Sequence, residues 1–202
     1  MRHTPDIDRG SASAHALMVD DAQELRAEIA RLRRENRALS IALAEMERVA
    51  ERDMLTPLFN RRYFLSALHQ CIARVERYGD PIALVYVDVD GLKAINDAFG
   101  HAAGDFVLVE VAERLQSAMR DKDVVARIGG DEFGILLENT GLTQAKATIR
   151  RLSQLISSTP CHYDRHSIPL SAAFGLTPIT PGLNAEELMG RADSEMYRDK
   201  RT

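Results

Sequence analysis

Two sets of acidic residues in this chain could hold a metal ion. Asp88 stands near the end of the apolar run from Ile82 to Asp90, which predicts a buried strand. Asp131 and Glu132 follow two glycines between short apolar runs, a pattern that predicts a tight hairpin. If the sheet brings these carboxylates together, they repel one another unless a cation lies between them. Because Mg²⁺ prefers carboxylates, phosphates and water, the pattern indicates metal-dependent phosphoryl or nucleotidyl transfer, with Lys93 available to neutralise phosphate charge.

The same hairpin has a simpler interpretation. A short acidic turn is usually a charged, solvated hairpin tip without a ligand. The two glycines, Gly129 and Gly130, favour a ligand because residues without side chains let a phosphate approach the backbone closely. The spacing alone does not identify a substrate, so the choice between these interpretations depends on the rest of the chain.

Composition limits the classes of protein that this chain can belong to. Its 202 residues are 45% hydrophobic and 28% charged, which suits one globular domain with an additional segment. A net charge of −4 argues against binding a nucleic acid polymer through a broadly basic surface. The two cysteines form no CxxC pair, and Cys71 is expected to be a buried, reduced thiol. Neither a membrane span nor a signal peptide is evident, so we expect a soluble, cytoplasmic protein.

The N-terminal quarter of the chain predicts a coiled coil. Residues 1–19 show no hydrophobic period and are expected to form a flexible tail, whereas residues 20–52 carry a heptad repeat. Leucine or methionine at the d positions, Ile29 at an a position and Asn36 at the next a position favour a parallel two-stranded coil. Glu28 would face Arg33 of the partner helix with attractive charge. The alternative is a single amphipathic helix packed on its own domain.

Residues 53–202 alternate between predicted helices and strands. Helices are expected from Asn60 to Gly79, from Gly91 to Phe99, from Gly100 to about Met119, from Thr143 to Ser157, and from Asn184 to the end of the chain. Strands are expected over residues 82–90, 123–128, 133–138 and 168–176. His162 and His166 fall in a predicted loop between two prolines, and zinc binding there is not favoured. The fold class is α/β, with a mixed sheet that contains the acidic hairpin and is covered by helices.

Five linked motifs resemble the GGDEF family of diguanylate cyclases. They span residues 53 to 202 with their order and spacing kept, which makes the resemblance far more specific than one motif could. The matching stretches are Asp53-x-Leu-Thr-x-Leu-x-Asn60-Arg61-Arg62, Asp88-x-Asp90-x-x-Lys93-x-x-Asn96-Asp97, Gly100-His101-x-x-Gly104-Asp105, Arg127-x-Gly129-Gly130-Asp131-Glu132-Phe133 and Ala192-Asp193-x-x-Met196-Tyr197-x-x-Lys200.

The resemblance implies an activity. It predicts a palm-like fold, one GTP bound per subunit, and a homodimer in which each ribose 3′-hydroxyl attacks the α-phosphate of the opposite GTP. The products are cyclic di-GMP and pyrophosphate. The alternative is a binding module that holds GTP or cyclic di-GMP and signals through the coiled coil without catalysis. The presence of Asp88, Asp131 and Glu132 favours the enzyme.

By the same resemblance, Asp88 and Asp131 would hold Mg²⁺, or Mn²⁺ in its place, with help from the Val89 carbonyl. Glu132 would activate the 3′-hydroxyl or hold a cation. Asn96 and Asp105 would read guanine, because a carboxylate can accept from the adjacent N1–H and N2–H groups of that base. The GTP phosphates would be bound by backbone amides and by positively charged side chains. The residues concerned are Gly91, Leu92, Lys93, Gly129, Gly130, Arg127 and Lys200, of which Lys200 would contact the γ-phosphate.

Several of these residues have ordinary structural alternatives. Asp97 and Asp105 could cap helices, His101 could be a turn or capping residue, and Arg127 could be a strand residue paired with a surface acid. The chain also lacks a Gly-Arg-Asn segment that often follows the lysine equivalent to Lys200, which predicts weaker GTP binding.

A second nucleotide site is predicted just before the acidic hairpin. Arg120 and Asp123 match, in type and distance from the glycine pair, the Arg-x-x-Asp site through which cyclic di-GMP inhibits relatives. A guanidinium and a carboxylate can each bond one edge of guanine. Arg151 and Arg74 are weaker candidates to complete this site, from the same or a neighbouring subunit. The alternative is an ordinary charged loop.

Overall fold

The computed structural model describes residues 8–200 of the protein, which divide into two units at Ala50. The described part of the first unit is one long helix, α1 (Asp8–Glu51), whose last residue is the first of the second unit. The flexibility expected of residues 1–19 stays a prediction, and residues 1–7 lie outside the described residues. The helix itself begins at Asp8, well before residue 20, where the predicted heptad repeat starts. The physical reason is that extending a helix costs far less than nucleating one, and this stretch is rich in alanine.

The predicted heptad positions of α1 form an exposed apolar stripe. Leu32 is 50% exposed and Leu39 is 70% exposed, although both are large aliphatic side chains. The neighbouring polar face is organised within the helix, where Arg31 pairs with Glu28 at 2.6 Å and with Glu35 at 3.1 Å. An exposed seam of this kind is what a coiled coil would bury, so pairing through α1 stays a prediction.

The second unit is built on a five-stranded sheet with the strand order β1-β3-β4-β2-β7. Its strands are β1 (Phe59–Asn60), β2 (Ala83–Val89), β3 (Val124–Arg127), β4 (Glu132–Leu137) and β7 (Ala172–Pro178). Only β1 and β3 run parallel, and the other neighbours are antiparallel. The predicted mixed sheet is therefore confirmed, with antiparallel pairs dominating. The predicted hairpin is β3–β4, and the glycine pair lies in its turn.

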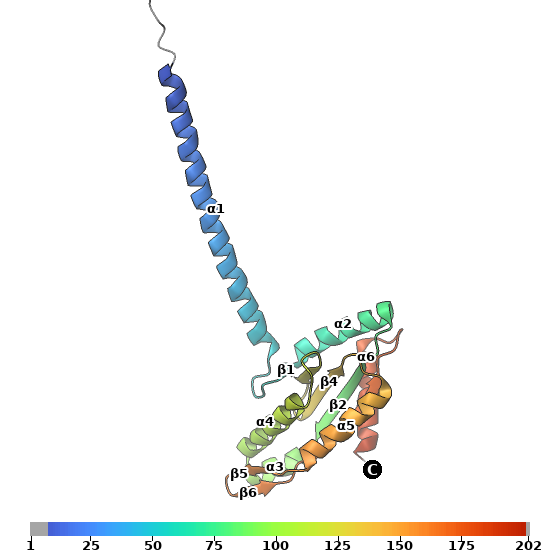
Figure 1. Cartoon of the computed structure of the whole chain (residues 1–202). Helices are drawn as coiled ribbons and strands as arrows, with labels where there is room; N and C mark the ends of the chain where they lie inside the picture. Colours follow the sequence, from blue (N-terminus) through green and yellow to red (C-terminus); the bar gives the residue numbers. More distant parts are fainter. Residues whose placement is uncertain (1–7, 201–202) are drawn as a thin grey trace, which may run out of the picture. The chain divides into compact units, whose positions relative to one another are not determined.

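Helices cover both faces of this sheet (Figure 1). One face carries α4 (His101–Ser117) and α5 (Leu142–Ser157), with the short α3 (Leu92–Phe99) beside α4. The other face carries α2 (Arg61–Tyr78) and α6 (Ala185–Asp199). The interior strand β2 is buried along its whole length because helices cover both of its faces, which explains its largely apolar sequence.

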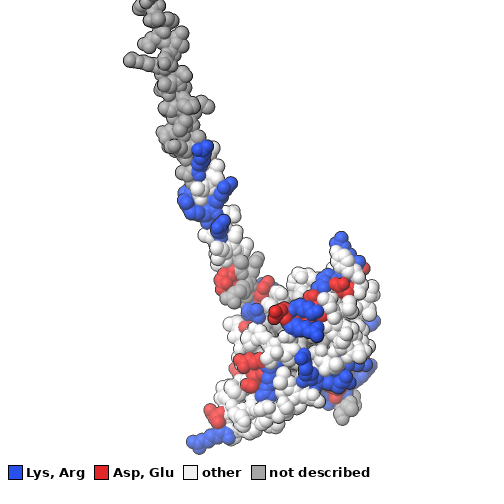
Figure 2. Space-filling model, viewed as in Figure 1, with Lys and Arg blue, Asp and Glu red and all other residues white. Residues whose placement is uncertain are grey.

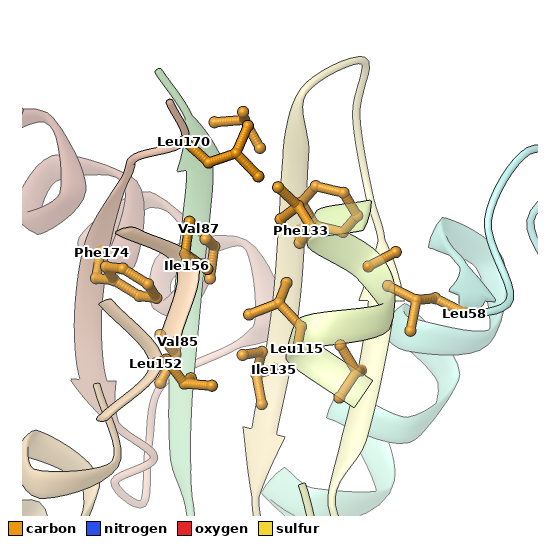
Figure 3. Close-up of a cluster of buried hydrophobic side chains, with 14 of the residues drawn as sticks. Leu58, Val85, Val87, Leu115, Phe133, Ile135, Leu152, Ile156, Leu170 and Phe174 are labelled. Atoms are coloured by element: carbon orange, nitrogen blue, oxygen red, sulfur yellow. The ribbon is translucent and has the colours of Figure 1, made fainter. Parts of the chain in front are cut away.

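Alternation along β2 divides its side chains between two hydrophobic clusters. Val85 and Val87 face α4 and α5, whereas Leu84 and Tyr86 face α2 and α6. Figure 3 shows the first cluster, in which Phe133 and Ile135 of β4 point into the same space as side chains from the covering helices. The alternation continues to the end of β2 and directs Asp88 toward the face covered by α2 and α6.

Capping residues set the ends of the two helices on that face. Asn60 accepts a hydrogen bond from the Tyr63 N–H at the start of α2, and Gly79 ends this helix in a left-handed conformation. At the start of α6, Asn184 and Glu187 form the reciprocal capping box that their spacing predicts. The two helices therefore begin directly after Asn60 and Asn184, where the sequence analysis expects them to begin.

The loop predicted around the two histidines is instead a two-stranded hairpin. It consists of β5 (Cys161–Tyr163) and β6 (His166–Ile168), separate from the main sheet. The strand expected over residues 168–176 is confirmed only from residue 172 onward, because Pro169 follows β6 directly and cannot donate a ladder hydrogen bond. The last strand of the main sheet accordingly starts at Ala172.

The surface of the second unit carries charges of both signs. Figure 2 shows Lys and Arg interspersed with Asp and Glu over the visible face, without a broad basic area. None of the helices in the described part of the chain has both the length and the apolar character of a membrane span.

Candidate active site

The end of β2 and the tip of the β3–β4 hairpin meet at one edge of the sheet. Asp88 of β2 lies directly opposite Glu132 of β4 in the antiparallel register. Next to this pair, the Val89 N–H donates to the Asp131 carbonyl at 3.1 Å, which ties the hairpin turn to the end of β2. The fold therefore brings together the acidic residues that the sequence places more than forty positions apart.

Asp88 is paired with the last described residue of the chain. Its carboxylate accepts a hydrogen bond from Lys200 Nζ at 2.6 Å, and the residue is only 9% exposed. Burial raises the pKa of Asp88, Lys200 opposes that rise, and the charges of Asp131 and Asp90 reinforce it. The same pairing raises the pKa of Lys200. The pKa values of Asp88 and Lys200 can both rise, because one ammonium lies among several carboxylates. Their negative charge favours the protonated form of each group, and a single positive charge does not cancel it.

This arrangement fits a divalent cation. The Lys200 ammonium occupies a position beside Asp88 where positive charge is favoured. Three carboxylates, those of Asp88, Asp90 and Asp131, stabilise this ammonium in its charged form. Among the described residues, no three Asp, Glu, His or Cys side chains converge closely enough to hold a metal alone. Mg²⁺ suits such an incomplete set, because it takes one or two carboxylates and completes its shell with phosphate oxygens and water.

Glu132 extends from the acidic site into a neighbouring cavity. The cavity has a volume of about 810 Å³ and is lined by Arg61, Tyr86 and Asp193 as well as by Glu132. Burial raises the pKa of Glu132, the carboxylates of Asp131, Asp88 and Asp193 add to the rise, and Arg61 counteracts it.

Gly129 makes room for the position of the Glu132 side chain. A side chain at residue 129 would overlap Glu132 Oε2, so the Glu132 side chain would have to move if residue 129 were larger than glycine. The Ile128 and Gly129 amides both donate to the Glu132 carbonyl, at 2.9 Å and 3.2 Å. The glycine of the motif therefore leaves the space that the Glu132 carboxylate occupies, while the two amides hold the Glu132 backbone.

Arg127 stabilises the hairpin turn through contacts of its side chain. Its guanidinium donates to the Gly130 carbonyl at 2.7 Å and pairs with Asp53 Oδ1 at 3.4 Å. Burial opposes ionisation of Asp53, but hydrogen bonds from Thr56 and the charge of Arg127 hold the pKa of Asp53 below its usual value. This geometry matches the interpretation of Arg127 as a strand residue paired with an acid, and a phosphate contact stays a prediction.

The predicted guanine readers lie on α3 and α4. Asn96 packs against Gly104 so closely that any side chain at residue 104 would overlap its Oδ1 atom. Asn96 Oδ1 is buried and has no hydrogen-bond partner among the described residues. A buried acceptor left unpaired costs roughly 1–3 kcal/mol, which a ligand donor could recover.

Asp105 lies on the exposed side of α4, well inside the helix. The residue at the N-cap of α4 is Gly100, and Asp97 lies within α3, so neither aspartate caps a helix. Gly91 caps α3 without a side-chain hydrogen bond, and Lys93 is exposed in the first turn beside Leu92. The capping alternative for both aspartates is thus excluded by where the helices begin.

Three residues of the predicted product site line a cavity of about 600 Å³. Arg120 and Asp123 come from the turn before β3, and Arg151 comes from α5. Asp123 accepts hydrogen bonds from its own turn, through the Arg120 amide at 3.1 Å, and from the Glu138 amide at 3.2 Å. Arg151 donates to the Ala118 carbonyl at 2.7 Å.

Arg74 does not line this cavity. Its guanidinium pairs with Asp80 at 2.9 Å and with Glu138 at 2.6 Å. Within one subunit it therefore lies outside the predicted site, because two acids hold it on α2. Its contribution from a neighbouring subunit stays a prediction.

Four residues around the site had no role assigned from sequence. Arg61, Tyr86 and Asp193 surround Glu132, and Asp53 holds Arg127. A partial signal exists, because Asp193 and Lys200 are seven residues apart and share one face of α6. The contacts of Arg61 and Tyr86 depend on how α2 packs against β2. The spacing of residues in the sequence carries no information about that packing.

Comparison with known proteins relates the chain to one family. The family model described as "Diguanylate cyclase, GGDEF domain" matches residues 50–202. Among curated proteins, the chain is 39% identical over 165 residues to the bifunctional diguanylate cyclase/cyclic di-GMP phosphodiesterase MucR of Pseudomonas aeruginosa, covering 81% of this chain and 24% of MucR. It is 33% identical over 156 residues to diguanylate cyclase DgcS of Shewanella oneidensis, covering 77% of this chain and 51% of DgcS.

Solved structures have the same fold. The coiled coil and GGDEF domain of DgcB from Caulobacter crescentus, in complex with c-di-GMP, matches with a TM-score of 0.79 at 28% identity. That match covers 88% of this chain and 94% of the DgcB structure. Diguanylate cyclase SiaD of Pseudomonas aeruginosa, in complex with its activator SiaC, matches with a TM-score of 0.73 at 30% identity, over 96% of this chain and 77% of SiaD.

The chain spans about a quarter to a half of the length of these two curated relatives. The family match nevertheless includes every strand of the main sheet and all the acidic residues of the site. The chain belongs to the GGDEF domain family of diguanylate cyclases.

Proposed function

We propose that this protein is a diguanylate cyclase that condenses two GTP molecules into cyclic di-GMP with a divalent cation, Mg²⁺ or Mn²⁺, as a homodimer. The observation that carries the proposal is the meeting of Asp88 with the Asp131–Glu132 turn at one edge of the sheet. The unpaired buried acceptor of Asn96 supports a base-binding site on the adjacent helices. Membership of the family supports the reaction.

In this proposal the side chains of Asp88 and Asp131 and the Val89 carbonyl hold the cation, which when bound supplies positive charge to the phosphates. Lys93 and the backbone amides at the start of α3, from Gly91 and Leu92, bind phosphate oxygens. Asn96 and Asp105 orient the base. Each of these groups fixes the α-phosphate in place, which lowers the entropy cost of bringing it to a nucleophile.

The bond that forms joins the 3′-oxygen of one GTP to the α-phosphorus of the other. The bond that breaks joins the same phosphorus to the pyrophosphate oxygen, so pyrophosphate leaves with the bonding electrons. The hydroxyl proton passes to the carboxylate of Glu132. This residue lies beside the site and lines the neighbouring cavity. Two such transfers close the ring, which requires two subunits facing each other.

The exposed seam of α1 supports a homodimer. Ile29, Leu32 and Leu39 are each at least 40% exposed and follow heptad spacing, with Asn36 between them at an a position. A single buried asparagine at such a position favours one register of a two-stranded coil. A second copy of the chain is the partner that offers a matching seam.

The cavity beside α5 supports product inhibition. Arg120, Asp123 and Arg151 offer two guanidinium groups and a carboxylate around about 600 Å³, the size of a ligand pocket. Cyclic di-GMP bound there would sit away from Asp88 and would act by holding two half-sites apart. Such inhibition is non-competitive with GTP.

The first prediction tests catalysis. Protein incubated with GTP and Mg²⁺ should yield cyclic di-GMP and pyrophosphate by chromatography, whereas ATP should yield no cyclic dinucleotide. Asp131→Asn removes one carboxylate charge from the site and should lower turnover by about a hundredfold or more. Asp164→Asn makes the same chemical change at an exposed turn and should leave turnover unchanged. Absence of product from the unaltered protein at every concentration would exclude the cyclase and favour a binding module.

The second prediction tests the guanine pocket. Gly104→Ala places a methyl group where Asn96 Oδ1 lies, so the amide must move and the KM for GTP should rise roughly tenfold or more. Asn96→Ala should have a similar effect, and the double variant should add little because both changes remove one interaction.

Gly190→Ala is the matched control for this experiment. It is the same substitution in a helix, at a position with open space around it. The KM of the control should equal that of the unaltered protein. An unchanged KM in Gly104→Ala would show that Asn96 does not contact the base.

The third prediction tests assembly. Replacing Leu32 and Leu39 together by aspartate puts charge into the seam and should give a monomer by light scattering, with activity lost most at low protein concentration. Ile41→Asp adds charge at an equally exposed apolar position outside the seam and should leave a dimer. A monomeric unaltered protein at micromolar concentration would refute the coil as the dimer contact.

The fourth prediction tests product control. Arg120→Ala should leave the initial rate near that of the unaltered protein, abolish tight cyclic di-GMP binding in calorimetry, and let product accumulate further. Arg150→Ala removes an exposed neighbouring charge on α5 that does not line the cavity and should preserve binding. Equal product affinity in all three proteins would rule out this cavity as the inhibitory site.

A further inference from the structure

Lys200 joins two parts of the site that lie far apart in sequence. It is the residue at the C-cap of α6, and its ammonium pairs with Asp88 at the end of β2. The resemblance assigns this lysine to a phosphate, yet here its ammonium lies on a carboxylate proposed to hold the metal. The contact is 2.6 Å long and involves a residue that is 9% exposed, so it is a close pair at a mostly buried site.

The charge balance explains why the pair forms. Asp88, Asp90 and Asp131 all act on the ammonium of Lys200. Asp90 is held by the Ser171 hydroxyl at 2.7 Å, which is neutral and leaves its charge in place. Within the described residues, Lys200 is the cation that forms an ion pair with Asp88. Without it, a carboxylate in a mostly buried position would face like charges, which is strongly unfavourable.

The backbone around Lys200 is anchored, but its side chain can move. The Lys200 N–H donates to the Met196 carbonyl, and the preceding residue, Asp199, accepts a hydrogen bond from the Phe174 amide of β7 at 3.0 Å. These contacts hold the end of α6 against the sheet. The lysine side chain itself is 39% exposed and has a flexible four-carbon stem. Its ammonium can therefore change partners without displacement of the helix.

We propose that Lys200 is the resident counter-ion of the metal site, which neutralises Asp88 until a divalent cation arrives and then transfers its ammonium to the nucleotide phosphates. The proposal rests on the proposed function, because it takes Asp88 as a metal ligand. Its consequence is that cation and lysine compete for one carboxylate. The site therefore binds a divalent cation poorly until the phosphates of GTP offer the ammonium a new partner, so that metal and nucleotide bind cooperatively.

The test measures Mn²⁺ binding without nucleotide, by calorimetry and by the loss of the free-ion signal in electron paramagnetic resonance. Lys200→Met keeps the length of the side chain but removes the competing charge, and should bind Mn²⁺ roughly tenfold more tightly than the unaltered protein. Arg198→Met removes a positive charge two residues away that pairs with Glu195 and not with Asp88, and should leave Mn²⁺ affinity unchanged. Addition of a non-reacting GTP analogue should tighten Mn²⁺ binding much more in the unaltered protein than in Lys200→Met.

The outcomes separate this inference from the proposed function. If no variant binds Mn²⁺ even with the analogue present, the proposed metal site is wrong. If all proteins bind Mn²⁺ with the analogue but Lys200→Met binds it no more tightly without nucleotide, only the role of Lys200 is overturned. Lys200→Arg is the control for the effect of changing this side chain on folding. Because it keeps the positive charge, it should retain weak Mn²⁺ binding without nucleotide. Tight binding by Lys200→Arg would also overturn the inference.

Discussion

Negative charge concentrated at one edge of the sheet is the constraint on which the site depends. The charges of Asp131 and Asp90 both act on Asp88 there, and burial of Asp88 removes water that would otherwise screen them. Because β2 is an interior strand, paired with β4 on one side and with β7 on the other, its end cannot move outward to relieve the repulsion. Positive charge must therefore be supplied from elsewhere, and in this structure α6 delivers it through Lys200.

The same strands supply both the core and the chemistry. On β2, Val87 points into the cluster under α4 and α5, while its neighbour Asp88 points to the opposite face. On β4, Phe133 and Glu132 divide in the same way. The acidic residues are therefore positioned by side chains buried directly beside them, and a rigid core fixes the separation of the carboxylates.

The hairpin turn is connected to the start of the second unit. Asp53 organises its own turn through the Thr56 amide and hydroxyl, and it also holds Arg127. Arg127 in turn donates to the carbonyl of Gly130, next to Asp131. A chain of contacts thus runs from the segment after α1 to the acidic turn.

Local patterns in the sequence determined most of the elements and their chemistry. The apolar run of β2, the glycine pair of the hairpin and the helix starts at Asn60 and Asn184 depend on neighbouring residues, so each could be predicted without a structure. The linked motifs identified the family because their order and spacing are themselves features of sequence. The start of α1 and the β5–β6 hairpin were missed, because helix extension and short strand pairing leave little local signal.

The tertiary structure decided which partners these residues have. Lys200 lies on Asp88 across 112 positions, Arg127 on Asp53 across 74, and Arg61, Tyr86 and Asp193 surround Glu132 from three separate elements. It also placed Arg74 away from the cavity that holds Arg120 and Arg151. Residue types and spacing specify which groups can ionise or donate. Which of them meet depends on how helices pack on the two faces of the sheet, because contacts between distant segments follow from the packing of the whole core.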